Sequence, residues 1–324
     1  MKIVVIGGGT GTYTVLSGLR DYPHQITAVI SMADSGGSNR ILRDEFGILP
    51  TSDIRQALVA LADEAEERDL FRKLFTYRFH QGVGISGMTF GNLFMAALAD
   101  ILGSQVEAIA ETAKILNCKG KILPVTLDDI QLLARYENGL QVIGEHWIDE
   151  PKHDGKLRLV ELVSIPTAKV YKTVLEEIAQ ADLIILGPGD LFTSIIANLI
   201  VGGMAQALQK TKAKLVFVVN IMTKYGQTYN YKATDFVTEI EKYVGRRMDK
   251  ILINSNTDYP QIALKKYQKE KAIPVEDDLG NDKRVVRADL MSEMVTKKVK
   301  GDSLIRSLLR HDGKKLARVL VSLE

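Results

Sequence analysis

The sequence has almost no cysteine and no long hydrophobic run. Its single cysteine, Cys118, excludes a disulfide within the chain. The longest apolar stretch, residues 195–207, is interrupted by Asn198 and two glycines. Because a membrane-spanning helix needs roughly 18 apolar residues, we expect no membrane span. The first residues also lack the apolar core and cleavage site of a secretion signal. Together these features predict a cytoplasmic protein.

Neither sign of charge is in excess. The 42 lysines and arginines nearly balance the 40 aspartates and glutamates, which gives a formal net charge of +2. We therefore expect no nucleic-acid partner. The five histidines lack the paired spacing of a zinc site, and no Gly-x-Ser-x-Gly elbow marks a hydrolase serine. Composition alone identifies no partner.

Apolar runs that look buried on both faces alternate with helical stretches along the 324 residues. This pattern is typical of an α/β fold with a doubly wound, mostly parallel, Rossmann-like sheet. We predict that residues 1–324 form a single nucleotide-binding domain. The runs are Ile3–Ile6, Ile26–Ile30, Leu183–Leu186, Leu215–Val219 and Lys250–Asn254.

Residues 119–164 follow a different pattern. Apolar and polar residues alternate at 121–125, 140–146 and 157–163, separated by Glu137-Asn138-Gly139 and His153-Asp154-Gly155. Alternation bounded by such turn residues is typical of hairpins. We therefore predict an antiparallel insertion over residues 119–164 of the domain.

A glycine-rich turn follows the first strand directly. Glycines there allow close backbone approach, and the free N–H groups of a helix start attract an anion, so the turn predicts a phosphate site. The sixth position counted from Gly7 is Thr12, so the dinucleotide fingerprint fails, and no lysine completes a P-loop. The turn does not say which nucleotide binds. The candidate phosphate ligands are Gly8, Gly9, Thr10, Gly11 and Thr12.

Three further loops are rich in glycine and hydroxyl groups, and the ends of parallel strands face one crevice. A ligand with a diphosphate that spans these loops is therefore the simplest prediction, and a helix dipole would assist the last of them. The candidates are Asp34, Gly36, Gly37 and Ser38 in the first, Ser86 and Asn92 in the second, and Gly187, Gly189, Thr193 and Ser194 in the third.

Two aspartates could carry chemistry at this crevice. Asp34 and Asp53 could converge on one Mg²⁺, which typically takes one or two carboxylates together with substrate phosphates. Alternatively, Asp53 caps the helix that begins near Ile54. The two roles are compatible. The end of the second strand carries Ser31 where an NAD-binding protein would place an acid, which argues against an NAD-linked enzyme.

The complete set of loops resembles the gluconeogenesis factor family of the YvcK type, within the CofD-like superfamily, over nearly the whole chain. That superfamily includes a phospholactate transferase that binds a guanine nucleotide. The motifs, in order, are the Ile-Gly-Gly-Gly-Thr-Gly start, Asp34-Ser35-Gly36-Gly37-Ser38, Asp53-Ile54-Arg55, Tyr77-Arg78-Phe79, Phe90-Gly91-Asn92-Leu93, Leu186-Gly187-Pro188-Gly189, Thr193-Ser194-Ile195-Ile196 and Asn220-Ile221-Met222-Thr223.

The resemblance implies a regulator that binds a UDP-sugar and supports cell shape and wall synthesis on gluconeogenic carbon, with no established reaction. It places the diphosphate at residues 8–12 and 187–194 and Asn220 at the crevice. It associates Tyr267 and Arg287 with the nucleotide-sugar. It also leaves open a protein partner in wall synthesis and a homo-oligomer.

Departures from the family pattern favour binding over catalysis. Ser35 stands where relatives commonly have a second aspartate, Met88 and Phe236 stand where histidine is frequent, and Gln227 replaces a usual glutamate. These changes remove groups that could titrate in acid–base catalysis. The alternative remains a Mg²⁺-dependent, nucleotide-linked transferase that uses Asp34 and Asp53. Beyond the UDP-sugar and this Mg²⁺, we assign no cofactor.

Overall fold

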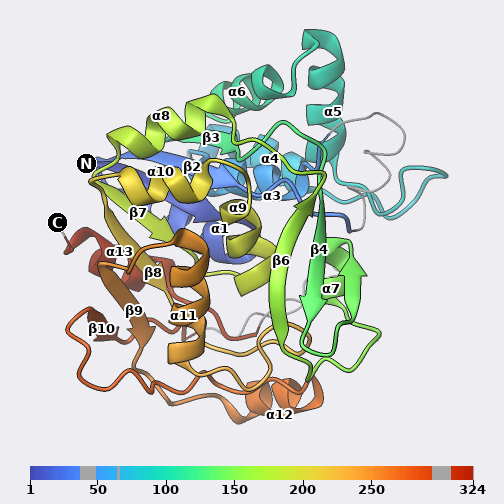
Figure 1. The fold of residues 1–324 in the computed structure, drawn as a ribbon. Coiled ribbons are helices and arrows are strands. Elements are labelled where there is room, and N and C mark those ends of the chain that lie inside the picture. The colour runs from blue at the N-terminus through green and yellow to red at the C-terminus, as the bar shows by residue number, and fades with distance from the viewer. Residues whose placement is uncertain (37–48, 64–65, 294–307, 324) are drawn as a thin grey trace.

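The computed structural model describes residues 1–36, 49–63, 66–293 and 308–323, and of residues 66–69 only the backbone. A seven-stranded sheet in the order β10-β9-β8-β7-β1-β2-β3 forms its centre, and its neighbouring strands are parallel (Figure 1). The strands are β1 (Lys2–Gly7), β2 (Gln25–Ile30), β3 (Lys121–Pro124), β7 (Leu183–Leu186), β8 (Lys214–Val218), β9 (Lys250–Asn254) and β10 (Val285–Ala288).

The direction of winding reverses at β1. From β1 the chain moves outward to β2 and β3, then returns to the other side of β1 as β7 and moves outward to β10. Such a reversal opens a crevice at the carboxyl ends of the two central strands. The loops after β1 and β7 both begin at this switch point.

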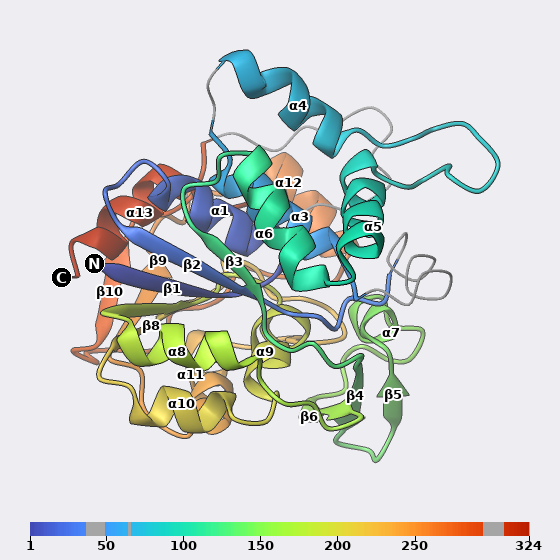
Figure 2. The ribbon, with the colours of Figure 1, turned by 90° about the horizontal axis from the view of Figure 1, so that it is seen from above.

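Helices cover both faces of the sheet (Figure 2). One layer contains α1 (Gly9–Leu19), α3 (Ser52–Leu61), α6 (Gln105–Ile115) and α13 (Gly313–Val321), with α4 (Glu66–Thr76) and α5 (Phe90–Leu102) farther out. The opposite layer contains α8 (Lys172–Gln180), α10 (Met204–Lys210) and α11 (Ala233–Val244). The remaining helical elements are α7 (Glu145–Asp149), the π-helix η1 (Leu191–Ile196), α9 (Ala197–Leu199) and α12 (Gln261–Lys269).

The two helical layers explain why the strands are apolar throughout. In β7 all four residues are buried, and in β1 every residue after Lys2 is buried. Strands covered on both faces need apolar residues at consecutive positions. The five predicted runs are strands of this sheet, so the predicted fold class is confirmed.

A small antiparallel sheet stands beyond the carboxyl ends of the central strands, in the order β5-β4-β6 (Figures 1 and 2). It consists of β4 (Gln131–Tyr136), β5 (Gln141–Ile143) and β6 (Leu159–Ile165), with α7 after β5. One part of the prediction is wrong: residues 121–124 form β3, which pairs in parallel with β2. This short strand is buried after its first residue, as a sheet strand under helices requires.

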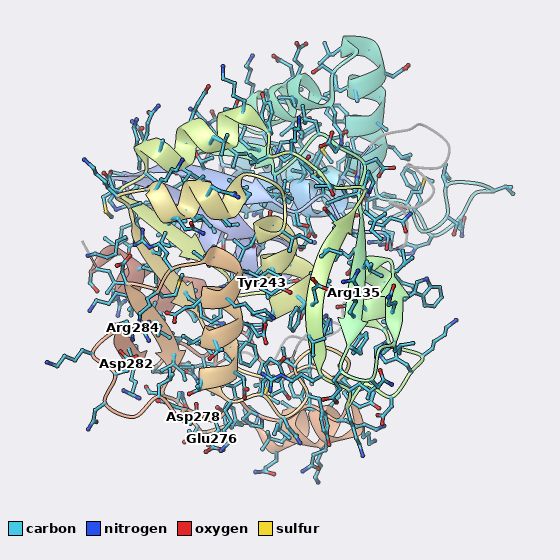
Figure 3. All side chains as sticks on the ribbon, in the orientation of Figure 1. Arg135, Tyr243, Glu276, Asp278, Asp282 and Arg284 are labelled. Carbon is cyan, nitrogen blue, oxygen red and sulfur yellow. The ribbon has the colours of Figure 1, made fainter. Side chains whose placement is uncertain are left out.

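Side chains from α11 hold the outer strand of this insertion. The hydroxyl of Tyr243, labelled in Figure 3, accepts a hydrogen bond from the Leu162 amide at 2.8 Å. Lys242 donates to the Val160 carbonyl at 2.9 Å. The insertion is therefore fixed to the body of the domain. In the part of the chain that the structure describes, no helix has the length and apolarity needed to cross a membrane.

The close approach of α1 and α13 requires a residue without a side chain at Gly18, which can be tested. A Cβ atom at Gly18 would lie 2.0 Å from the Gly313 carbonyl oxygen, a backbone atom that cannot move aside cheaply. We expect Gly18→Ala to lower the free energy of unfolding by about 1–3 kcal/mol, the usual cost of overpacking. Urea denaturation measures this change. Ser17→Ala, at the neighbouring position of α1, adds no atom to this contact and is the control. Equal losses in the two variants would refute the explanation.

Candidate functional site

The loops after β1 and β7 touch one another at the switch point. A Cβ atom at Gly11 would lie 2.0 Å from the Pro188 carbonyl oxygen, so only glycine permits this contact. On the second loop, the Cβ position of Gly189 lies 3.3 Å from Cβ of Ser194 and 3.7 Å from the Gly8 carbonyl oxygen. The structure therefore brings together the two loops that the sequence predicts to hold a diphosphate.

Helix α1 begins immediately after β1, with Gly8 as its N-cap residue. Gly9 has a φ of 61°, a left-handed conformation that favours glycine. Its N–H group donates to the carboxylate of Asp53. The N-terminus of α1, which the sequence predicts to bind phosphate, thus faces the carboxylate of Asp53.

The capping role suggested for Asp53 is wrong in its details. The N-cap of α3 is Thr51, and Asp53 lies within the first turn of that helix. Its carboxylate points instead toward the first loop, since a Cβ atom at Gly8 would lie 2.6 Å from Asp53 Oδ2. Burial and the charge of Asp34 raise the pKa of Asp53 to about 7. Asp34 and Asp53 are therefore neighbours, as predicted.

The insertion contributes further acids to the crevice through α7. Burial, followed by the charges of Asp34 and Asp149, raises the pKa of Glu145. Ser35, where the family pattern has an acid, accepts a hydrogen bond from the His146 amide at 3.2 Å. Helix α7 thus lies against the loop after β2 and adds carboxylates to it.

Lys224 joins the insertion to the second glycine loop. Its ammonium group binds Asp190 Oδ2 at 2.7 Å and also contacts Asp149 on α7. Burial raises the pKa of Asp149 to about 6, although the charge of Lys224 opposes this. Gln227 donates to Asp149 at 2.9 Å and to the Thr193 hydroxyl at 3.2 Å. A glutamate at position 227 would instead repel Asp149.

Two asparagines complete the central part of the site. Asn198 is fully buried and donates to the Gly7 carbonyl at 3.1 Å, which connects α9 to the end of β1. Asn220 donates to the Gly189 carbonyl at 2.8 Å, so it lies at the crevice as predicted. Among the described residues, the buried side-chain oxygens of Asn198, Asn220 and Thr12 have no hydrogen-bond partner. They are candidates to face a bound ligand.

The predicted loop that contains Ser86 and Asn92 is divided by the structure. Asn92 is buried at the start of α5, where it accepts from Arg55 at 3.0 Å and donates to Ser52 at 3.2 Å. It therefore orients side chains of α3 next to Asp53. Ser86 lies in an exposed turn and its amide donates to the Gly82 carbonyl of the same turn. No contact found among the described residues brings Ser86 to the switch point.

Tyr267 and Arg287 lie toward the β10 side of the sheet. Tyr267 is buried in a small apolar cluster, and its hydroxyl accepts from the Leu309 amide at 3.2 Å. Arg287 is on edge strand β10 and binds both oxygens of Asp277, at 2.5 and 3.1 Å. Their proposed contacts with a nucleotide-sugar stay predictions. Of the loop after β2, Gly36 donates to Asp34 at 2.9 Å, whereas Gly37 and Ser38 lie outside the described residues.

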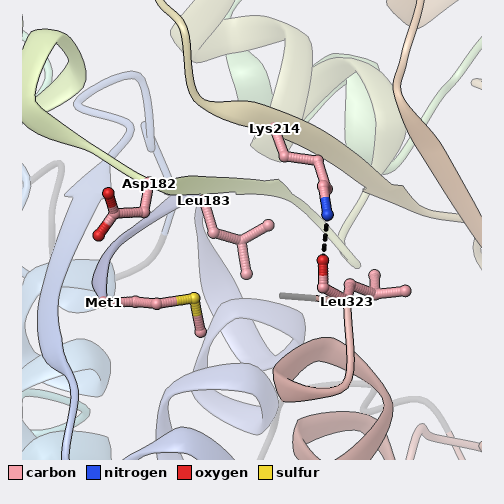
Figure 4. A pocket seen from close by; sticks show the side chains of 5 residues that line it. All are labelled: Met1, Asp182, Leu183, Lys214 and Leu323. Atoms are coloured by element: carbon pink, nitrogen blue, oxygen red, sulfur yellow. Dashed lines mark hydrogen bonds between the residues drawn. The ribbon is translucent and has the colours of Figure 1, made fainter.

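A cavity of about 440 Å³ lies at the opposite end of the sheet (Figure 4). Met1, Asp182, Leu183, Lys214 and Leu323 line it, and Lys214 donates to the Leu323 carbonyl. It contains none of the predicted site residues. Since ligands of doubly wound sheets bind at the carboxyl ends of the strands, we place the candidate site at the switch point.

Comparison with known proteins agrees with this architecture. The model of the family described as 2-phospho-L-lactate transferase CofD matches residues 3–296. The chain is 40% identical over 321 residues to the putative gluconeogenesis factor of Thermotoga maritima, covering 99% of this chain and 98% of that one. It is 38% identical over 323 residues to the gluconeogenesis factor of Bacillus subtilis, with 99% and 98% covered. The chain belongs to the gluconeogenesis factor family.

Solved structures extend this family assignment to the fold. A crystal structure of a Bacillus halodurans protein has a TM-score of 0.89 and 34% identity, with 99% of each chain covered. A second crystal structure of the Bacillus halodurans protein, described as a member of the upf0052 family, has a TM-score of 0.88 at 34% identity, with 98% of this chain and 99% of that chain covered. The predicted resemblance to the gluconeogenesis factor family is confirmed.

The crevice offers Mg²⁺ two neighbouring carboxylates and not a complete set of protein ligands. Within residues 1–36, 49–63, 66–293 and 308–323, no group of three or more histidine, cysteine or acidic side chains is arranged to hold a metal ion. Asp34 and Asp53 are close enough for the charge of one to raise the pKa of the other. Two such carboxylates match a Mg²⁺ that takes its other ligands from water and substrate phosphates.

Several residues at the candidate site were missed from the sequence. They are Glu145, Asp149, Asp190, Asn198 and Lys224. Asp190 and Lys224 follow predicted strands closely, so their position near strand ends was a usable signal. Glu145 and Asp149 reach the crevice only because the insertion folds over the strand ends. No local sequence pattern predicts that contact.

The environment of Asp53 predicts a pH-dependent stability. Its pKa is about 7 in the folded protein and near 3.8 in an unfolded chain. The folded protein therefore retains a proton that the unfolded chain loses, so stability falls as pH rises from about 4 to about 7. We expect Asp53→Asn to flatten this dependence and to be more stable than wild type above pH 7, as urea unfolding would measure. Asp21→Asn, at a side chain that is 63% exposed, is the control. An unchanged slope in Asp53→Asn would contradict this explanation.

Proposed function

We propose that this protein is a cytoplasmic regulator that binds a UDP-sugar and acts on a partner in cell-wall precursor supply during gluconeogenic growth. The observation that carries the binding step is the contact between the two glycine loops at the switch point. The names of its relatives support the association with gluconeogenesis. The sugar and the partner come from the family resemblance of the sequence.

The geometry supports a diphosphate as the anchoring group. The loops after β1 and β7 lie within contact distance, so two neighbouring phosphates can each meet one loop. Thr193 and Ser194 stand in the first turn of η1, where their hydroxyl groups can donate to an anion. The unpartnered oxygens of Asn220 and Thr12 would accept hydrogen bonds from sugar hydroxyls or bound water.

Binding of a diphosphate must change the ion pairs or the protonation of the acids at the site. Asp53 already accepts a bond from Gly9, and Lys224 is bound to Asp149 and Asp190. A diphosphate adds negative charge next to these acids and so raises their pKa values. Binding therefore requires either proton uptake by the acids or a divalent cation. Lys224, with its side chain 31% exposed, is positioned to exchange a carboxylate for a phosphate oxygen.

The alternative is a Mg²⁺-dependent transferase, favoured by the proximity of Asp34 and Asp53 and by the name of the matched family. When bound, the ion would neutralise phosphate charge. Against it stand the amide of Gln227, which donates to Asp149, and the buried side chains of Met88 and Phe236. None of these three groups can move a proton. Asp53 and Asp149, with pKa values of about 7 and about 6, remain able to do so. Our preference for regulation by binding therefore rests on the family resemblance of the sequence, and the experiments below decide between the two functions.

The binding proposal is tested first by calorimetry of the purified protein with UDP-N-acetylglucosamine, GDP and NAD, with and without Mg²⁺. We expect the UDP-sugar to bind without Mg²⁺. Lys224→Met should weaken this binding about tenfold or more, the loss expected for one charge-assisted bond to phosphate. Lys121→Met, on β3 and paired with Glu177, is the matched control.

The outcomes separate the parts of the proposal. If the wild type binds no UDP-sugar, the proposed function fails. If the wild type binds and Lys224→Met binds equally well, only the role of Lys224 fails. A preference for GDP that requires Mg²⁺ would favour the transferase instead.

The transferase reading is tested by the double variant Asp34→Asn, Asp53→Asn. If the protein only binds its ligand, the variant should bind the UDP-sugar at least as tightly as the wild type, because two acids that oppose the diphosphate are gone, and should support growth on gluconeogenic carbon in cells that lack the native protein. Loss of growth with unchanged ligand affinity would indicate chemistry at these carboxylates. Calorimetry and growth of the complemented strain provide the two readouts.

A further inference from the structure

The buried amide of Gln227 joins both sides of the crevice. Its side chain is 2% exposed. The amide oxygen accepts from the Phe192 backbone N–H at 3.3 Å, and the amide nitrogen donates to Asp149 Oδ1 at 2.9 Å and to the Thr193 hydroxyl oxygen at 3.2 Å. Phe192 and Thr193 belong to η1, whereas Asp149 ends α7 of the insertion.

Two of these contacts determine which way the amide faces. A backbone N–H group can only donate, so the amide oxygen must face Phe192. An ionised carboxylate can only accept, so the amide nitrogen must face Asp149. Lys224 donates to the same oxygen of Asp149, and its positive charge favours the ionised form. Turning the amide over would therefore lose both contacts.

The orientation of the amide sets the direction of the Thr193 hydroxyl group. Because the Thr193 oxygen accepts from Gln227, its own proton must point toward a different acceptor. Among the residues that the structure describes, this hydroxyl makes no second hydrogen bond. Thr193 is 6% exposed, so bulk water has little access to it. The hydroxyl is a buried donor directed away from Gln227.

The neighbouring backbone amides of η1 are already used. The Phe192 amide donates to Gln227, and the Ser194 and Ile195 amides donate to the Asp190 carbonyl at 2.9 and 3.1 Å. An anion at this point would therefore be met by the Thr193 hydroxyl rather than by these N–H groups.

We propose that Gln227 is a positioning residue that directs the Thr193 hydroxyl toward a phosphate oxygen of the ligand. This inference rests on the proposed function, in which a diphosphate binds between the two glycine loops. The residue type at position 227 then sets the affinity for the anion. A glutamate there would accept the proton of Thr193, and the phosphate would lose that donor.

The test is calorimetry at pH 8 with two probes, UDP-N-acetylglucosamine and inorganic pyrophosphate. Asp149 is ionised at this pH, since its pKa is about 6. We expect Gln227→Glu and Thr193→Val each to raise the dissociation constant of both probes about tenfold or more, as for the loss of one hydrogen bond to a charged group. Thr112→Val, which removes a buried hydroxyl from α6, is the control and should bind like the wild type.

The double variant separates capture of the hydroxyl proton from charge repulsion. If Gln227→Glu acts through Thr193, it should weaken binding by no more than about threefold when Thr193→Val is already present. An equal loss with and without Thr193→Val would show that the added charge simply repels the ligand. That result would overturn the proposal.

Gln227→Met tests a purely structural role and does not depend on the folding of Gln227→Glu. Methionine has a similar size but neither captures nor directs the Thr193 hydroxyl. We expect its dissociation constants to lie between those of the wild type and Thr193→Val, although urea unfolding should show a loss of stability. Binding equal to the wild type, or weaker than that of Thr193→Val, would overturn the positioning role.

The two probes separate this proposal from the proposed function. If the wild type binds pyrophosphate but not the UDP-sugar, the proposed function fails, and the variants still decide the role of Gln227 with pyrophosphate. If the wild type binds neither probe, both proposals fail. If it binds both and Thr193→Val binds them equally well, only the role of Gln227 fails.

Discussion

The contact between Gly11 and the Pro188 carbonyl is the constraint on which the site depends. It is possible only because a glycine occupies position 11, since a Cβ atom would lie 2.0 Å from that oxygen. The contact holds the loops after β1 and β7 together at the point where the sheet reverses direction. Every other feature of the crevice is arranged around these two loops, including the acids that α3 and α7 bring to it.

The acids make the crevice more negatively charged than its glycine loops alone suggest. A helix start with free N–H groups attracts anions, yet Asp53 accepts the bond from Gly9. Asp149 and Asp190 share Lys224 in a similar way. The protein thus supplies its own negative charge where a ligand phosphate would lie. A ligand phosphate must therefore replace these carboxylates as the partner of Gly9 and Lys224, or bind beside them. Protons and divalent cations that neutralise the added charge become part of the binding equilibrium.

The sequence predicted the parts of this molecule that local patterns determine. Consecutive apolar residues identified β1, β2, β7, β8 and β9, and glycine spacing identified the two central loops. Strand β3 was misassigned because Lys121–Pro124 is short, and its parallel neighbour β2 is distant in sequence. The contacts of Glu145 and Asp149 depend on how the insertion folds over the strand ends. Such contacts arise from tertiary structure, which periodicity does not encode.

The bonds that α11 makes to β6 have a consequence for the solution behaviour of the insertion. A strand at the edge of a sheet offers unpaired N–H and C=O groups to strands of other chains, which is a common route to aggregation. Here the Leu162 amide is taken by Tyr243 and the Val160 carbonyl by Lys242. The opposite edge is strand β5, which is only three residues long. The small sheet is therefore protected from edge-to-edge association on one side by side chains and on the other by its brevity.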